Sequence, residues 1–102
     1  MLTKHTIEEQ IRRNARRFTA CGISKIGLFG SYARQEQDKN SDIDILIDFQ
    51  EGEETFDNFM AVCALLDTLF KEHKVEVVTA KGLSPYIGPH ILNSVEYVQI
   101  AN

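Results

Sequence analysis

Cysteine, proline and tryptophan are scarce in this chain of 102 residues, which has two cysteines, two prolines and no tryptophan. Cys21 and Cys63 match no metal-ligand spacing, and a disulfide is the less favoured interpretation in a chain without a secretion signal, so we expect free, buried thiols. No apolar run approaches the roughly 20 residues that a membrane-spanning helix needs. The first residues lead into no apolar stretch that could act as a secretion signal. We therefore expect a cytoplasmic protein without a membrane association.

Positive charge is also scarce, because 11 Lys and Arg stand against 15 Asp and Glu, for a net charge of −4. This balance excludes a general nucleic-acid-binding protein. One basic cluster stands out: Arg12, Arg13, Arg16 and Arg17. It could be a solvated helix face, a contact surface for an acidic partner or RNA, or a source of charge for the phosphates of a nucleotide. The sequence leaves these interpretations open.

The length and the ordinary composition, 43% hydrophobic and 25% charged, indicate one globular domain over residues 1–102. A capping box, with Thr6 as N-cap and Glu9 reaching back to it, predicts the start of the first helix, and Gly22 predicts its end. Ser84-Pro85, an N-cap followed by proline at the first helical position, predicts the start of the last helix. Helices and strands alternate along the chain, which predicts an α/β fold built in layers rather than a bundle or a barrel. The periodicity predicts helices at about 7–20, 31–37, 56–72 and 85–93, and strands at 25–30, 42–49, 74–79 and 97–100.

The strand predicted at 42–49 carries a pair of carboxylates. Asp42 and Asp44 are two residues apart, so both point to the same face, with backbones roughly 6–7 Å apart. Because like charges repel, a divalent cation between them would stabilise the pair, and oxygen ligands favour Mg²⁺ or Mn²⁺. The other interpretation is a solvated sheet face with no ligand.

A glycine and a serine lie ten residues before this pair, between a predicted strand and a predicted helix. Gly30 would let a phosphate approach the backbone, and the hydroxyl of Ser31 could add a hydrogen bond. Taken alone, the same residues fit an ordinary turn in which Ser31 caps the helix. A phosphate-binding turn followed by an aspartate pair is, however, a more specific combination than either part.

Glu76 alternates with Val75 and Val77 in the strand predicted at 74–79. If that strand neighbours the aspartate strand, the carboxylate of Glu76 completes a site with three acids, which suits phosphoryl or nucleotidyl transfer. One carboxylate could also accept the proton of an incoming hydroxyl. Otherwise Glu76 is a surface residue of an edge strand.

Gly30-Ser31, ten intervening residues and Asp42-x-Asp44 together resemble the signature of the DNA polymerase β-like nucleotidyltransferase superfamily. The surrounding Leu-Phe-Gly-Ser-Tyr-Ala-Arg and Ser-Asp-Ile-Asp-Ile-Leu-Ile are similar to its minimal (MNT) branch. The resemblance implies a small mixed β-sheet flanked by helices, with ATP as substrate and two Mg²⁺ ions, which Mn²⁺ could replace. It implies that the nucleotide is bound by Gly30, Ser31 and Arg34. It also implies that the metals are held, and the reaction catalysed, by Asp42, Asp44 and Glu76.

Many minimal members are antitoxins of HEPN-type ribonuclease toxins, and some transfer AMP from ATP to a tyrosine of the toxin. The resemblance therefore implies a protein adenylyltransferase with a HEPN partner. Two residues depart from the family pattern: Glu76 stands where aspartate is common, and Gln35 follows Arg34 where many relatives have glycine. A longer acid can misplace the proton acceptor, whereas we expect Gln35 to change only the end of a helix.

Two function hypotheses follow. The chain is either an active enzyme that transfers AMP to a protein hydroxyl, or a binding module of the same fold that neutralises its partner by contact. The length argues against two other classes, because antibiotic-modifying nucleotidyltransferases generally use a second domain and a polymerase needs a template-binding region. Both remaining hypotheses place the acceptor or target on another protein.

Overall fold

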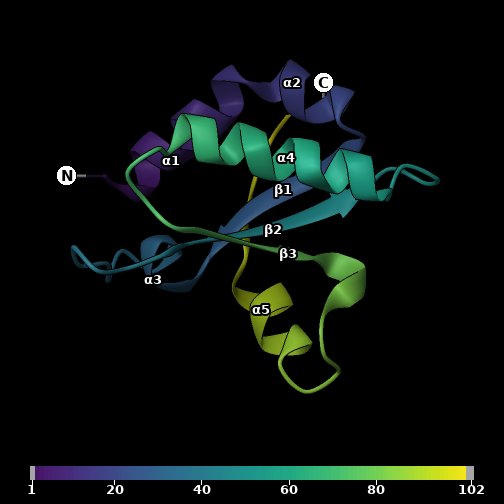
Figure 1. The fold of residues 1–102 in the computed structure, drawn as a ribbon. Helices are drawn as coiled ribbons and strands as arrows, with labels where there is room; N and C mark the ends of the chain where they lie inside the picture. Colours follow the sequence, from purple (N-terminus) through teal and green to yellow (C-terminus); the bar gives the residue numbers. More distant parts are fainter. Residues whose placement is uncertain (1, 101–102) are drawn as a thin grey trace.

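A four-stranded sheet in the order β3-β2-β1-β4 organises the computed structural model, which describes residues 2–100 (Figure 1). β1 runs antiparallel to both β2 and β4, whereas β2 and β3 are parallel and are joined by the crossover helix α4. The elements are α1 (Lys4–Arg13), α2 (Ala15–Ala20), β1 (Ile23–Phe29), α3 (Gly30–Ala33), β2 (Ile43–Phe49), α4 (Phe56–Leu69), β3 (Val75–Thr79), the 3₁₀ helix η1 (Ala80–Gly82), α5 (Gly88–Ser94) and β4 (Glu96–Val98).

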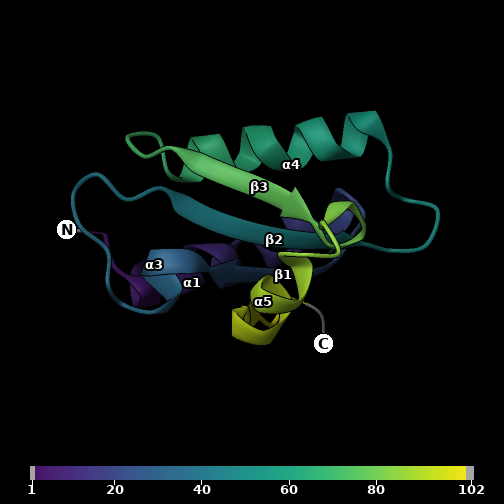
Figure 2. The same ribbon diagram turned by 90° about the horizontal axis from the view of Figure 1, so that it is seen from below.

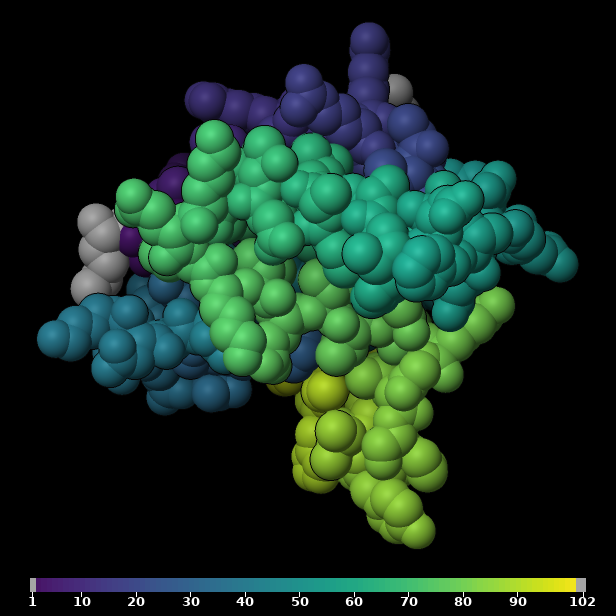
Figure 3. Space-filling view, in the orientation of Figure 1, coloured from purple at the N-terminus to yellow at the C-terminus, as the bar shows by residue number. Residues whose placement is uncertain are grey.

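The helices form layers on the two faces of this sheet. α1, α2 and α4 cover one face, and α5 lies on the other (Figures 1 and 2). The segment from η1 through α5 projects from the body of the molecule, as the space-filling view shows (Figure 3). The mixed sheet with flanking helices confirms the predicted fold class.

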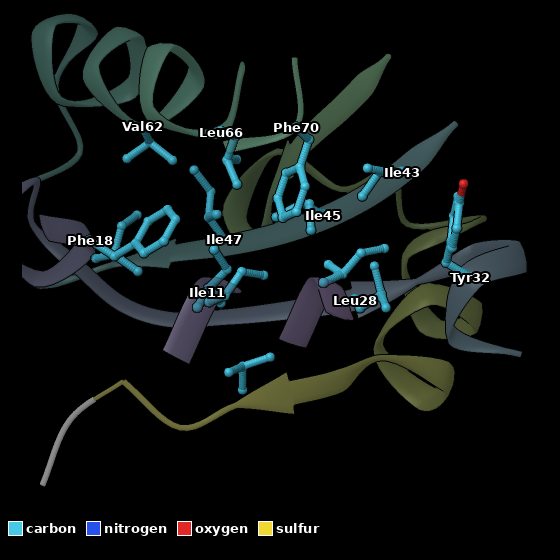
Figure 4. Packing of buried hydrophobic residues seen from close by; sticks show 14 of the residues in the cluster. Ile11, Phe18, Leu28, Tyr32, Ile43, Ile45, Ile47, Val62, Leu66 and Phe70 are labelled. Atoms are coloured by element: carbon cyan, nitrogen blue, oxygen red, sulfur yellow. The ribbon is translucent and has the colours of Figure 1, made fainter. Parts of the chain in front are cut away.

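The core lies between the sheet and the helices α1, α2 and α4. The alternation of β2 directs Ile43, Ile45 and Ile47 into this layer, where all three are fully buried (Figure 4). Each buried side chain of this size stabilises the fold by about 1.5–3 kcal/mol. The helices contribute a second set of buried side chains: Ile7, Ile11, Phe18, Val62, Leu66 and Phe70.

The first predicted helix is present, but its start and its continuity differ from the prediction. Thr3, rather than Thr6, is the N-cap, and its hydroxyl accepts a hydrogen bond from the Thr6 amide. The helix is also interrupted at Asn14, whose side chain donates to the carbonyl of Gln10 at 2.8 Å. A side-chain bond of this kind competes with helix continuation and explains the break. Gly22 adopts a φ of 85° directly after α2, so the predicted stop is confirmed.

The helix predicted at 31–37 is shorter than expected, because α3 ends at Ala33. Gln35 follows with a φ of 58°, the left-handed conformation that favours glycine. Its amide bonds the carbonyl of Tyr32 at 3.1 Å, and the Glu36 amide bonds the carbonyl of Ser31 at 2.9 Å. These two bonds form a Schellman motif with glutamine at its glycine position.

The last helix does not start at Ser84-Pro85, so that prediction is wrong. The hydroxyl of Ser84 accepts from the Tyr86 amide at 3.1 Å and closes a turn instead. α5 begins at Gly88, with Pro89 in its first turn. Ser84-Pro85 is the stronger local signal for a helix start, but the N-cap of α5 is Ile87, which makes no side-chain cap hydrogen bond.

The two cysteines and the lengths of the helices bear on two further expectations. Cys21 and Cys63 are free, as predicted, but both are only partly buried. Burial raises the pKa of the Cys63 thiol, which keeps it protonated and unreactive at neutral pH. In the part of the chain that the structure describes, every helix is too short or too polar to cross a membrane.

Candidate nucleotide and metal site

The turn between β1 and α3 brings the backbone against a carboxylate. Gly30 has a φ of 75°, and a Cβ atom at this position would overlap the carboxylate of Asp44. Only glycine satisfies both the conformation and the close approach without strain. The turn predicted from Gly30-Ser31 is therefore present, and it lies beside the predicted acid pair.

The strand register brings the three predicted acids to one face of the sheet. Asp44 pairs with Phe29 of β1 on one side and with Glu76 of β3 on the other. Asp42 lies two residues before Asp44, so its side chain leaves the backbone on the same face. β2 and β3 are parallel neighbours, so the strand of Glu76 lies next to the strand of the two aspartates, as its place in the site requires.

The carboxylates lie within electrostatic reach of one another. Burial raises the pKa of Asp44 above its usual value, and the charges of Glu76 and Asp42 raise this pKa further. Arg34 acts in the opposite direction, which places its guanidinium near the same acid. The ionised form of Asp44 is therefore less favourable in the fold than in water, a property common among residues of functional sites.

Sequence reasoning missed one member of this cluster, Lys74. Its ammonium lies 3.4 Å from Oε1 of Glu76 and 3.9 Å from Oδ2 of Asp42. The residue directly precedes β3, and its carbonyl accepts a hydrogen bond from the Ile43 amide at 2.9 Å. The available signal was the two-residue spacing between Lys74 and Glu76 within the predicted strand, because such residues share a face.

The three residues predicted to bind the nucleotide surround the turn. Gly30 and Ser31 open α3, and Ser31 is partly buried. Arg34 is exposed and donates from Nε to Glu36 at 2.7 Å. Tyr32, the next residue, is only 3% exposed and packs in the core. A helix of four residues adds little dipole, so any anion here would depend on individual N–H and O–H donors.

The donor set suits a hard divalent cation, since it consists of carboxylate oxygens beside a glycine turn with space for close approach. In the described residues, no three Asp, Glu, His or Cys side chains are arranged as a ready-made metal site. Two of the three acids face the Lys74 ammonium instead. The chemistry of the residues fits Mg²⁺ or Mn²⁺, provided that the carboxylates turn toward the ion.

The basic cluster lies apart from this site. Arg12 and Arg13 both pair with Glu9, at 2.9 and 3.3 Å. The cluster spans the junction of α1 and α2, before β1 begins, whereas Gly30 follows the end of β1. The three interpretations that the sequence left open for this cluster stay predictions.

Comparisons with known proteins agree with this geometry. Residues 7–98 match the nucleotidyltransferase domain family. A Methanocaldococcus jannaschii protein, named provisionally as a protein adenylyltransferase, is 42% identical over 72 residues, which are 71% of this chain and 75% of its own length. The protein adenylyltransferase MntA of Thermococcus cleftensis is 33% identical over 99 residues, which are 96% of this chain and 98% of its own.

Solved structures share the fold. One, described provisionally as a minimal nucleotidyltransferase, has a TM-score of 0.79 at 25% identity and covers 93% of this chain and 95% of its own. A toxin–antitoxin complex with AMP-PNP contains a chain with a TM-score of 0.62 at 22% identity, covering 96% of this chain and 73% of its own. The family match runs from the first buried residue of α1 to the end of β4, so it includes every strand of the sheet. The chain therefore belongs to the nucleotidyltransferase domain family.

Proposed function

We propose that this chain is a metal-dependent protein adenylyltransferase that moves AMP from ATP to a hydroxyl of a partner protein. The acceptor in this proposal is a tyrosine of a HEPN-type toxin, which the chain neutralises as its antitoxin. One observation carries the proposal: Asp44 and Glu76 stand in register on adjacent strands, beside the glycine turn at Gly30.

Each residue has a role in this proposal. Asp42, Asp44 and Glu76 hold two Mg²⁺ ions, which supply Lewis-acid stabilisation of charge on the phosphate oxygens. The Ser31 hydroxyl and the backbone of Gly30 donate to the terminal phosphates of ATP. One of the carboxylates accepts the proton of the tyrosine hydroxyl. The acceptor oxygen then bonds to the α-phosphorus, the bond to the β-phosphate oxygen breaks, and pyrophosphate leaves.

Support for a protein acceptor comes from the relatives. The Thermococcus cleftensis relative is a protein adenylyltransferase by name, and it aligns with nearly the whole of this chain. Chains with the same fold occur in toxin–antitoxin structures, one of which contains AMP-PNP. A toxin partner and a bound nucleotide are thus proposed for this chain by similarity to those proteins.

The test is label transfer. The purified chain is incubated with Mg²⁺, ATP labelled at the α-phosphate and the protein encoded beside it. We expect label on that protein, and we expect Asp42→Asn and Asp44→Asn each to lower the rate by about a hundredfold or more, because metal-bound charge stabilisation contributes several kcal/mol. Asp48→Asn, on the same strand and face but four residues beyond Asp44, is the matched control.

A tight complex without transfer would contradict the enzyme and favour neutralisation by contact. Glu76→Gln separates the third acid from the other two. It should reduce the transfer rate while leaving ATP binding largely intact, which equilibrium binding of a fluorescent ATP analogue would measure. An unchanged rate would remove Glu76 from the catalytic site.

A further inference from the structure

Lys74 occupies a position among the carboxylates that the proposed function does not use. Asp42 and Lys74 lie next to each other at the start of the parallel β2–β3 pair, because Ile43 pairs with Val75. The backbone is fixed at this point by the hydrogen bond between the Ile43 amide and the Lys74 carbonyl. The side chain, in contrast, is 70% exposed and can change its rotamer without unpacking the core.

The charges at this end of the sheet are unevenly compensated. The single ammonium of Lys74 contacts Asp42 and Glu76, while Asp44, between them, has no ion pair with a described residue. The nearest guanidinium, that of Arg34, is engaged by Glu36 at 2.7 Å. Three carboxylates and one ammonium leave an excess of two negative charges, which favours the binding of a further cation.

We propose that Lys74 is a built-in counterion, which substitutes for the divalent cation between Asp42 and Glu76 in the metal-free protein and must withdraw when the cation binds. This inference rests on the metal site of the proposed function. The ammonium takes up lone pairs of these carboxylates and adds a positive charge that repels an incoming cation, so it competes with the metal and weakens its binding. The flexible, exposed stem of lysine allows the exchange, whereas a rigid bidentate guanidinium would hold the carboxylates more firmly.

The test compares Lys74→Met with Lys71→Met, a control that removes the same charge three residues earlier from an exposed turn with no ion pair among the described residues. Mn²⁺ is titrated into metal-free protein and binding is followed by electron paramagnetic resonance. We expect Lys74→Met to bind Mn²⁺ about three- to fivefold more tightly than the control, since exposed ion pairs contribute modestly. Lys74→Arg keeps the competing charge and should bind no more tightly than wild type.

Thermal denaturation gives a second readout. In EDTA, Lys74→Met should melt below Lys71→Met, because the carboxylates lose their counterion. With saturating Mn²⁺ the difference should vanish, since the metal has replaced the ammonium. A difference that persists equally in both conditions would assign Lys74 a merely structural role and overturn the inference. Equal Mn²⁺ affinity in the two variants, or no Mn²⁺ binding to either, would also overturn it.

The outcomes separate this inference from the proposed function. If wild type transfers AMP but Lys74→Met binds Mn²⁺ no more tightly than the control, the inference alone fails. If Lys74→Met binds Mn²⁺ more tightly and wild type transfers no AMP, the counterion stands and the adenylyltransferase fails.

Discussion

Among single residues, Asp44 shows most directly how the site opposes the stability of the fold. It is half-buried in the middle of the carboxylate cluster and lacks the ion pairs that Lys74 gives to its neighbours. Burial, followed by the charges of Glu76 and Asp42, raises its pKa. Because the pKa in the folded chain exceeds the unfolded value, Asp44 favours the fold below its unfolded pKa, and this contribution is lost as the pH rises through the folded pKa.

Asp44→Asn should therefore stabilise the metal-free protein at neutral pH. The melting temperature in EDTA should rise by a few degrees at about pH 7, and this gain should disappear near pH 3, where the carboxyl is protonated in both states. Circular dichroism melts at the two pH values measure the effect, with Asp48→Asn as the control. A gain of equal size at both pH values would contradict the electrostatic explanation.

Gln35 occupies a backbone position at which glycine is the favoured residue. Its φ of 58° places a side chain at a position where glycine has no steric cost. Gln35→Gly should stabilise the chain by about 1 kcal/mol, because strain of this kind costs roughly that amount. Urea denaturation measures the change. Gln35→Ala keeps the strain and should show no gain, and a gain of similar size in both variants would rule strain out.

How far the sequence predicts the site depends on the range of the interaction. Gly30, Asp42 and Asp44 follow from local spacing, since the turn and the strand face are set by neighbouring residues. Glu76 could be included only conditionally, because the pairing of β2 with β3 depends on how α4 crosses the sheet. Lys74 was missed because its contact with Asp42 exists only in that register.

Secondary structure elements show the same distinction. The alternation of β2 and the helical pattern of α4 predict both elements closely, because their hydrophobic faces match the core that they enter. The start of α5 was predicted wrongly, since Ser84-Pro85 is the better local capping signal and yet the helix begins at Gly88. A Cβ at Gly88 would lie 3.1 Å from the Cβ of Leu83, so the small residue occurs at this close approach.

The crossover helix α4 offers a test at this scale, because it connects the two strands that carry the acids. Thr55 is its N-cap, and its hydroxyl accepts a hydrogen bond from the Asn58 amide at 3.1 Å. Thr55→Ala should lower the free energy of unfolding by about 1 kcal/mol, whereas Thr55→Ser keeps the acceptor and most of the stability. Urea denaturation followed by circular dichroism measures both, and equal losses would contradict the role of the cap.

In the whole molecule, the end of β1 and the starts of β2 and β3 meet at one end of the sheet (Figure 2). This topology gathers the glycine turn, the three acids and Lys74 from segments that are up to 46 residues apart, from Gly30 to Glu76. The helices α1, α2 and α4 pack on the opposite face of the sheet (Figure 1). A small sheet thus suffices to assemble the candidate site.

The most direct test is a crystal structure of the chain with Mg²⁺ and a non-hydrolysable ATP analogue. The account predicts a cation at about 2.1 Å from carboxylate oxygens of Asp42 and Asp44. It also predicts terminal phosphates against Gly30 and Ser31, and a Lys74 ammonium withdrawn from Asp42. A nucleotide bound at another surface, or one bound here with a cation that touches neither aspartate, would contradict it.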